Sequence, residues 1–136
     1  MKLLDVEVYT PSKAIYSNKA VSVTVPGSLG SFQILYNHAP ILSSLEIGRV
    51  KIEDETGKKL NFATSGGTVE VLNNKVLLLV ESFENSDDID IVRAKEAKER
   101  AEQRLKKESV EQKIDMLRAE FALKRAINRL KISALH

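Results

Sequence analysis

All six glycines and all three prolines of this 136-residue chain lie within residues 1–86, and residues 87–136 contain neither. Both residue types interrupt helices and mark the turns between strands. The segregation therefore predicts a β-rich first part, residues 1–86, and a helical second part, residues 87–136. The fold class is then α+β, and the chain length is compatible with one domain or two small ones.

Short segments with alternating apolar and polar residues follow one another in the first part. The pair Asn73-Asn74 separates two of them and suits a two-residue hairpin, because asparagine tolerates positive φ. Alternation buries one face of each strand, so the pattern predicts an antiparallel β-sandwich or barrel. Gly27 with Gly30, and Gly66 with Gly67, are predicted to form turns that need positive φ. The predicted strands cover residues 4–9, 20–25, 49–53, 59–63, 68–72 and 75–80.

Two helices are predicted in the second part. Asp87 and Asp88 suit the positive end of a helix dipole, and a helical period runs from them to Leu105. Ser109 followed by Gln112 is a capping box, which predicts a second helix ending near Ile132. The connection between the helices is short, so we expect an antiparallel two-helix hairpin.

The two predicted helices share a repeated pattern. Residues 93–105 and 118–130 are identical at seven of their thirteen positions. Alanines recur at helical spacing in both copies and form one stripe. Such a stripe allows close approach of two helix backbones but buries little area, about 0.8 kcal/mol per methyl. We therefore expect a hairpin that is marginally stable by itself and can open.

An arginine stripe flanks the alanine stripe in both copies. A solvated charged face is one interpretation of this stripe. In the other, arginines from both helices converge on a phosphate, which guanidinium groups bind in bidentate fashion. Residues 116–136 carry five Lys and Arg against one acid, Glu120, which favours an acidic partner. The stripe consists of Arg93, Arg100 and Arg104 in the first copy and Arg118, Arg125 and Arg129 in the second.

The composition excludes several kinds of site. With no cysteine and only His38 and His136, the chain lacks a disulfide framework, a thiolate nucleophile and a cysteine or multi-histidine metal site. No Ser, Cys or carboxylate is spaced to form a catalytic set with His38, so we predict no enzymatic activity. The net charge of +2 is too small for a general polyanion binder.

The hydropathy pattern predicts neither a membrane span nor a secretion signal. The longest purely apolar run, residues 76–80, has five residues, whereas a span needs about 20. An acid, Asp5, lies where a signal peptide keeps its apolar core. We therefore expect a reduced, cytoplasmic chain.

Several segments, in order along nearly the whole chain, resemble the epsilon-subunit family of bacterial F-type ATP synthases. The glycine-rich and His-Ala-Pro segments of that family resemble residues 27–30, 34–35, 37–40 and 45–48. Its Ser-Gly-Gly signature, with Glu-Val after it, resembles residues 65–71. The Ile-Asp-x-x-Arg-Ala motif, linked in this family to ATP binding, matches residues 89–94, and the end of its second helix matches residues 118–130.

The resemblance implies a non-catalytic central-stalk subunit, peripheral at the cytoplasmic face of the membrane. It implies that the sandwich docks on the gamma subunit and the c-ring, and so couples the rotor to the catalytic head. It also implies that the hairpin either folds down or extends into the alpha and beta subunits of the head, where it inhibits ATP hydrolysis.

In some members of the family the folded hairpin binds ATP as a regulatory ligand, and no metal or prosthetic group is expected. Arg125 and Arg129 lie one helical turn apart and share a face, as Arg93 and Arg100 do. Carried over residue by residue, the implied ATP site consists of Glu84, Ile89, Asp90, Arg93, Ala94, Arg100, Arg125 and Arg129.

A second class of function is a nucleic-acid-binding β-barrel with a basic helical tail. Such a protein usually stacks bases on aromatic side chains. Here aromatic residues make up 5% of the chain, are scattered, and include no Trp. We therefore predict that nucleic acid is not a partner.

Overall fold

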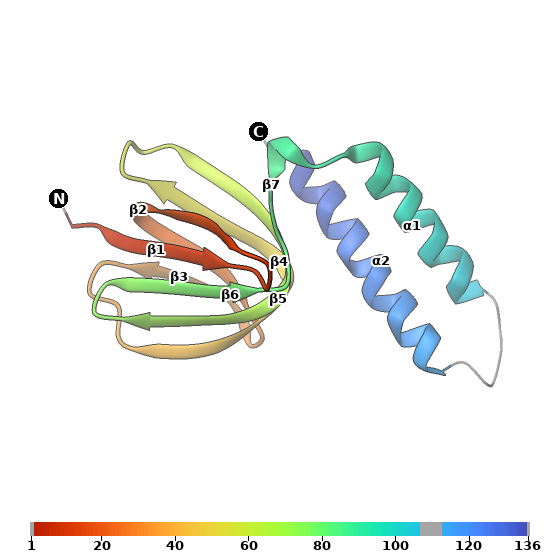
Figure 1. Ribbon diagram of the computed structural model, residues 1–136, viewed down its shortest axis with the longest axis horizontal. Helices are drawn as coiled ribbons and strands as arrows, with labels where there is room; N and C mark the ends of the chain where they lie inside the picture. Colours follow the sequence, from red (N-terminus) through yellow and green to blue (C-terminus); the bar gives the residue numbers. More distant parts are fainter. Residues whose placement is uncertain (1, 107–112, 136) are drawn as a thin grey trace.

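The computed structural model describes residues 2–106 and 113–135, and Figure 1 shows a β-sandwich beside a pair of helices. A short 3-10 turn, Ser86–Asp88, connects the two parts. In chain order the elements are β1 (Leu4–Tyr9), β2 (Ala14–Gly27), β3 (Gly30–Leu35), β4 (Ile41–Asp54), β5 (Lys59–Leu72), β6 (Lys75–Val80), β7 (Phe83–Asn85), α1 (Ile91–Lys106) and α2 (Lys113–Ser133).

The strands form a sheet that closes on itself. The first half of β2 pairs with β1, with Leu4 opposite Ala20, and its second half pairs with β3 and β4. From β4 the path continues through β5 and β6 to β1, where Asp5 lies opposite Lys75 in a parallel pairing. The predicted sandwich is confirmed, and β1–β6 is the one parallel pairing among the described strands.

The core of the sandwich is mainly aliphatic. Alternate side chains of the strands point inward, and Leu4, Val23, Ile52 and Leu78 are fully buried there. This close-packed cluster contains strand residues only, so the helices contribute no side chain to it.

Aromatic stacking fixes the last strand to the sandwich. The ring of Phe83 in β7 stacks on that of Phe62 in β5, with centroids 4.2 Å apart. β7 also pairs with β5, Glu84 lying opposite Ala63. The chain therefore leaves the sandwich from a well-anchored position.

The asparagine hairpin is confirmed. Asn73 and Asn74 connect β5 to β6 with φ values of 49° and 63°. The predicted turn between Gly27 and Gly30 is confirmed as well. Gly30 has the expected positive φ, 130°, but Gly27 does not, so that part of the prediction is wrong.

The prediction of a turn at Gly66 and Gly67 is wrong, although their φ values of 107° and 148° are positive as expected. Both residues lie inside the long strand β5. A Cβ atom at Gly67 would collide with the carbonyl oxygen of Leu79 in β6. Glycine is needed here because two backbones approach each other, not because the chain turns.

The strands are longer and more numerous than the alternation predicts. β2, β4 and β5 each have 14 residues, and along their length they pair with different neighbours. β3 and β7 are not predicted. In β3 only Ile34 is buried, and β7 has three residues, so neither presents an alternating pattern.

The first helix begins later than the two acids predict. Asp87 and Asp88 lie in the 3-10 turn, where the side chain of Asn85 accepts a hydrogen bond from the Asp87 amide at 3.0 Å. Ile89 is extended, with φ −73° and ψ 124°, and this interrupts the helical path. The predicted start of a continuous helix at Asp87 is therefore wrong.

Asp90 provides the N-terminal cap of α1. Its Oδ1 accepts a hydrogen bond from the Arg93 amide at 3.0 Å, which satisfies one of the free donors of the first turn. α2 ends at Ser133, one residue beyond the prediction. The predicted capping box at Ser109 and Gln112 lies outside the described residues.

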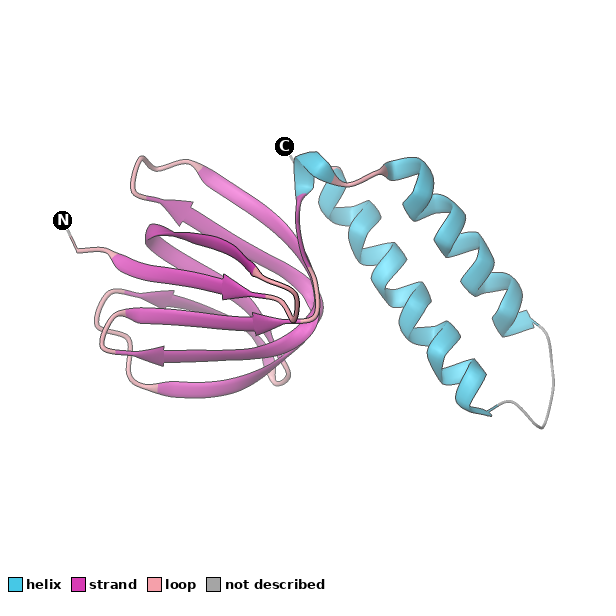
Figure 2. Ribbon diagram, viewed as in Figure 1, coloured by secondary structure: helices cyan, strands magenta, loops and turns pink. Residues whose placement is uncertain are grey.

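α2 lies between α1 and the sandwich, as Figures 1 and 2 show. Four of the six stripe alanines are buried, none of them more than 2% exposed: Ala94, Ala101, Ala119 and Ala126. The other two, Ala97 and Ala122, are half-buried.

An apolar cluster and a hydrogen bond are among the contacts that attach the hairpin to the sandwich. Ile132 of α2 packs with Ile89 and with Ala63 of β5 in a small apolar cluster. Asn128 donates a hydrogen bond from Nδ2 to the carbonyl oxygen of Gly48 in β4, over 2.8 Å. The apolar part of this interface is much smaller than the core of the sandwich.

Candidate functional site

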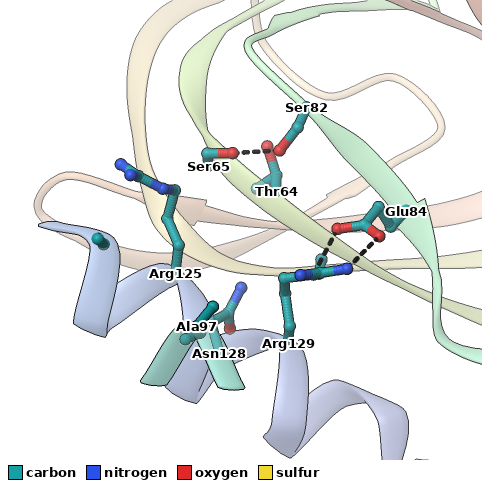
Figure 3. Close-up of a pocket in the computed structure, with 11 residues that line it drawn as sticks. Thr64, Ser65, Ser82, Glu84, Ala97, Arg125, Asn128 and Arg129 are labelled. Atoms are coloured by element: carbon teal, nitrogen blue, oxygen red, sulfur yellow. Dashed lines mark hydrogen bonds and ion pairs between the residues drawn. The ribbon is translucent and has the colours of Figure 1, made fainter. Parts of the chain in front are cut away.

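A cavity of about 340 Å³ lies where the hairpin meets the sandwich, and Figure 3 shows its lining. Residues of β5, the β6–β7 segment and β7 form one side, and residues of both helices form the other. The lining consists of Ala63, Thr64, Ser65, Ser82, Glu84, Ala97, Ala122, Arg125, Ala126, Asn128 and Arg129.

An ion pair crosses this cavity from helix to sheet. Arg129 Nε lies 2.8 Å from Glu84 Oε1, and Nη2 donates a hydrogen bond to Oε2 over 3.0 Å. Figure 3 shows the guanidinium group facing the carboxylate with both contacts. The side chains are 27% and 34% exposed, so solvent screens the pair only in part.

Arg125 is the second cation of the cavity. It lies one turn before Arg129 on the same side of α2 and is exposed. It also lines a neighbouring cavity of about 300 Å³, together with Phe121 and Lys124. Two guanidinium groups against the single carboxylate of Glu84 leave the wall of the first cavity net positive, which suits an anion.

Hydroxyl groups line the opposite wall. The side-chain oxygens of Ser65 and Ser82 are in hydrogen-bond contact, and Figure 3 shows Thr64 beside them. Hydroxyls both donate and accept hydrogen bonds. The cavity therefore places cationic donors opposite adaptable hydroxyls, an arrangement that can hold a phosphate or a sugar.

The structure brings together three of the eight candidate site residues, Glu84, Arg125 and Arg129. The other five lie outside the cavity lining. Ile89 is 7% exposed and belongs to the apolar cluster with Ile132. The remaining four are distributed along α1 and its start: Asp90 caps the helix, Ala94 is buried in the helix pair, and Arg93 and Arg100 are exposed.

The convergence of arginines from both helices is not seen in the cavity. Both of its arginines, Arg125 and Arg129, come from α2, and α1 contributes Ala97. The side chains of Arg93 and Arg100 have the exposure expected of a solvated face.

Several cavity residues were not predicted from the sequence. Ser65 and Ser82 lie in or beside strands, where a serine has no distinctive spacing. Asn128 had a usable signal, because it is the only uncharged polar residue in residues 118–130. An isolated amide in a basic, apolar helix face indicates a specific hydrogen bond, and Asn128 makes one to Gly48.

The described residues contain neither a cluster suited to a metal ion nor a helix suited to a membrane. In residues 2–106 and 113–135, no group of three or more His, Cys, Asp or Glu side chains is placed to hold a metal ion. Within the same part of the chain, neither helix combines the length and apolarity needed to cross a membrane.

Fold and cavity together define a two-domain protein in which a closed β-sandwich carries a docked helical hairpin. Two family models describe these parts. Residues 3–86 match the β-sandwich domain of the ATP synthase delta/epsilon chain, and residues 87–134 match its long α-helix domain. The chain therefore belongs to the ATP synthase delta/epsilon chain family, and the resemblance noted in the sequence is confirmed.

Curated bacterial relatives carry the name ATP synthase epsilon chain. The chain is 42% identical to that of Desulforamulus reducens over 125 residues, covering 92% of each chain. It is 44% identical to that of Nitratidesulfovibrio vulgaris strain DP4 over 131 residues, covering 96% of each.

A solved structure shares the fold at low sequence identity. A chain in the Euglena gracilis mitochondrial ATP synthase, OSCP/F1/c-ring, aligns with a TM-score of 0.85 and 20% identity. The alignment covers 100% of this chain and 83% of the Euglena chain. This likeness concerns the fold alone.

Proposed function

We propose that this chain is the non-catalytic epsilon subunit in the central stalk of a bacterial F-type ATP synthase. The names of its bacterial relatives support this role. The structural neighbour from the Euglena gracilis mitochondrial ATP synthase, OSCP/F1/c-ring, is consistent with it. Its partners are then the gamma subunit, the c-ring and the alpha and beta subunits of the catalytic head. It lies peripherally at the cytoplasmic face of the membrane.

We further propose that the hairpin is a regulatory element that binds ATP when docked. The observation that carries this proposal is the cavity between hairpin and sandwich, with Arg125 and Arg129 on one wall and hydroxyls on the other. Because residues of the sandwich and of α2 both line it, a ligand that bridges them stabilises the docked state. A ligand shifts such an equilibrium by no more than its difference in affinity for the two states.

The hairpin is suited to undocking because its interfaces are small. Its helix pair buries alanine methyls, and among the described residues its contact with the sandwich includes a small apolar cluster, an amide hydrogen bond and an ion pair. In our proposal, low ATP releases the hairpin. The basic segment 116–136 then reaches acidic surfaces of the catalytic head and inhibits ATP hydrolysis.

An ATP titration of the purified full chain, followed by backbone amide shifts, tests the ligand. We expect saturable shifts around Arg125, Arg129 and Ser82, and their loss in Arg125→Ala. Arg118→Ala is the matched control, since Arg118 is an exposed arginine of the same helix outside the cavity lining. Wild-type amides that do not move at millimolar ATP contradict the nucleotide site and leave the stalk assignment standing.

The stalk and inhibitory roles need a separate assay. We expect the full chain to bind a complex of the catalytic head with gamma and to suppress its ATP hydrolysis, with less suppression at saturating ATP. Absence of binding to the gamma-containing complex contradicts the stalk role. Binding without any change in hydrolysis contradicts the inhibitory role alone.

A further inference from the structure

The ion pair between Glu84 and Arg129 connects two segments that move apart when the hairpin undocks. Glu84 lies on β7, which is part of the sandwich, and Arg129 lies on α2. Between β7 and α1 the chain passes through the 3-10 turn and the extended residue Ile89. The pair thus closes a contact across the junction of the two domains.

In this pair, Glu84 occupies one of the two guanidinium groups of the cavity, that of Arg129. Glu84 lies against the Nε–Nη2 edge of the guanidinium group: Nη2 donates a hydrogen bond to Oε2, and Nε lies 2.8 Å from Oε1 in an ion pair without hydrogen-bond geometry. A phosphate that approaches this edge meets a carboxylate already bound there. Two anions cannot share the edge without mutual repulsion, so binding there requires an exchange.

We propose that Glu84 and Arg129 form a latch that holds the hairpin docked in the ligand-free chain, and that a phosphate group binds Arg129 by replacing Glu84. The replacement of Glu84 by phosphate rests on the proposed phosphate site, whereas the latch does not. Removing the carboxylate should therefore have opposite effects: docking weakens and phosphate binding strengthens. A Glu84 that served only as a ligand contact would instead weaken phosphate binding when it is changed.

Docking is measured on the full chain without ligand. Because the chain has no cysteine, Glu55→Cys and Arg104→Cys provide exposed labelling positions on sandwich and hairpin for pulsed dipolar distance measurements. Glu84→Gln should lower the ratio of docked to undocked molecules about fivefold, as expected for a partly exposed ion pair with one charge-assisted hydrogen bond. The control Glu81→Gln makes the same charge change at an exposed position outside the cavity and should leave the ratio unchanged.

The measured docking ratios test the latch. If the ratio of docked to undocked molecules in Glu84→Gln equals that in Glu81→Gln, the latch is overturned. If the latch holds, Arg129→Gln also lowers the ratio, and the double variant Glu84→Gln/Arg129→Gln loses no more than Arg129→Gln alone, because the two groups act as a pair. Additive losses overturn it. The sandwich stays folded in these variants because its core contains neither residue, and far-ultraviolet circular dichroism checks this.

The exchange is tested with tripolyphosphate, which has no base or sugar. Glu84→Gln should bind it at least about threefold more tightly than the wild type at low salt, since a like charge is removed from the site. Equal or weaker binding overturns the exchange. Failure of every variant and of the wild type to bind tripolyphosphate overturns the exchange and the proposed phosphate site together, while the docking ratio still decides the latch.

Discussion

The alanine stripe of the hairpin can be tested with a single enlarged side chain. Ala101 in α1 is 1% exposed, so its methyl group is enclosed by the helix pair. In Ala101→Leu, three additional carbons enter this enclosed space. The backbones have to separate, or other side chains have to leave their preferred rotamers, and overpacking of this kind costs about 1–3 kcal/mol.

The magnitude matters because the interface it disturbs is weak. The four buried stripe alanines contribute about 0.8 kcal/mol per methyl, or about 3 kcal/mol in all. The cost of one leucine is therefore comparable to the stabilisation from the whole stripe. We expect the ratio of paired to separated helices to fall by about 5- to 150-fold, whereas the sandwich, whose core consists of strand residues only, keeps its stability.

Amide hydrogen exchange measures both effects in one sample. Protection in α1 and in the described part of α2 should fall in Ala101→Leu, and protection in β5 and β6 should stay at the wild-type value. Gln103→Leu is the control, because Gln103 is exposed on the same helix and leucine is a good helix former. Unchanged protection of both helices in Ala101→Leu would refute the conclusion that they are held together by close packing of small residues.

Three further predictions concern local features. Asp90→Ala removes the N-terminal cap of α1 and should cost about 1 kcal/mol of helix stability, seen as faster exchange in its first turn; an unchanged rate contradicts the capping role. Gly67→Ala should destabilise the sandwich by about 3 kcal/mol or more, because its Cβ meets the backbone of the next strand. The control Gly57→Ala, with no atom within 4 Å of the added carbon, should cost about 1 kcal/mol. Equal losses of Tm in the two variants would refute the steric argument. The hydroxyl of Thr56 donates a hydrogen bond to the Asp54 carboxylate and lowers its pKa. The ionised carboxylate therefore stabilises the fold above the unfolded pKa of about 3.9, and this stabilisation is lost as the pH falls through the lower folded pKa. The difference in the free energy of unfolding between wild type and Asp54→Asn should accordingly shrink over that acid range. A difference that stays constant contradicts the stabilising role of the ionised Asp54.

The secondary structure was most predictable where one residue type has a local reason to be present. Asn73 and Asn74 favour a two-residue hairpin because asparagine tolerates positive φ, and both have it. The alanine spacing predicted a buried helix contact because helical periodicity places those methyls on one side, and Ala101 and Ala126 are buried there.

Local reasoning failed where contacts with distant segments decide the conformation. The two acids predicted a helix start at Asp87, but Ile89 contacts Ala63 and Ile132 and remains extended, so α1 starts after it. The paired glycines predicted a turn, but β6 approaches the backbone at Gly67 and keeps the pair inside a strand.

The candidate site was likewise predictable in part from the sequence. The arginine stripes can be read from the sequence because the period of a helix is known, and so can the preference of Arg125 and Arg129 for one face. The implied ATP residues followed from the family resemblance, which no rule of spacing supplies. That Glu84 lies against Arg129, 45 residues later in the chain, depends on the docking of α2 at the end of the sandwich.

By itself, the amino-acid sequence determined the division into a β-rich and a helical part, the hairpin of alanine-lined helices, and the family. These features depend on local backbone preferences and on side-chain periodicity, which act over a few residues. Only the tertiary structure decided which arginines face the cavity, that serine hydroxyls form its other wall, and that a carboxylate already occupies one guanidinium group. Those outcomes depend on how closed strands and docked helices bring distant residues together, and no local preference encodes that geometry.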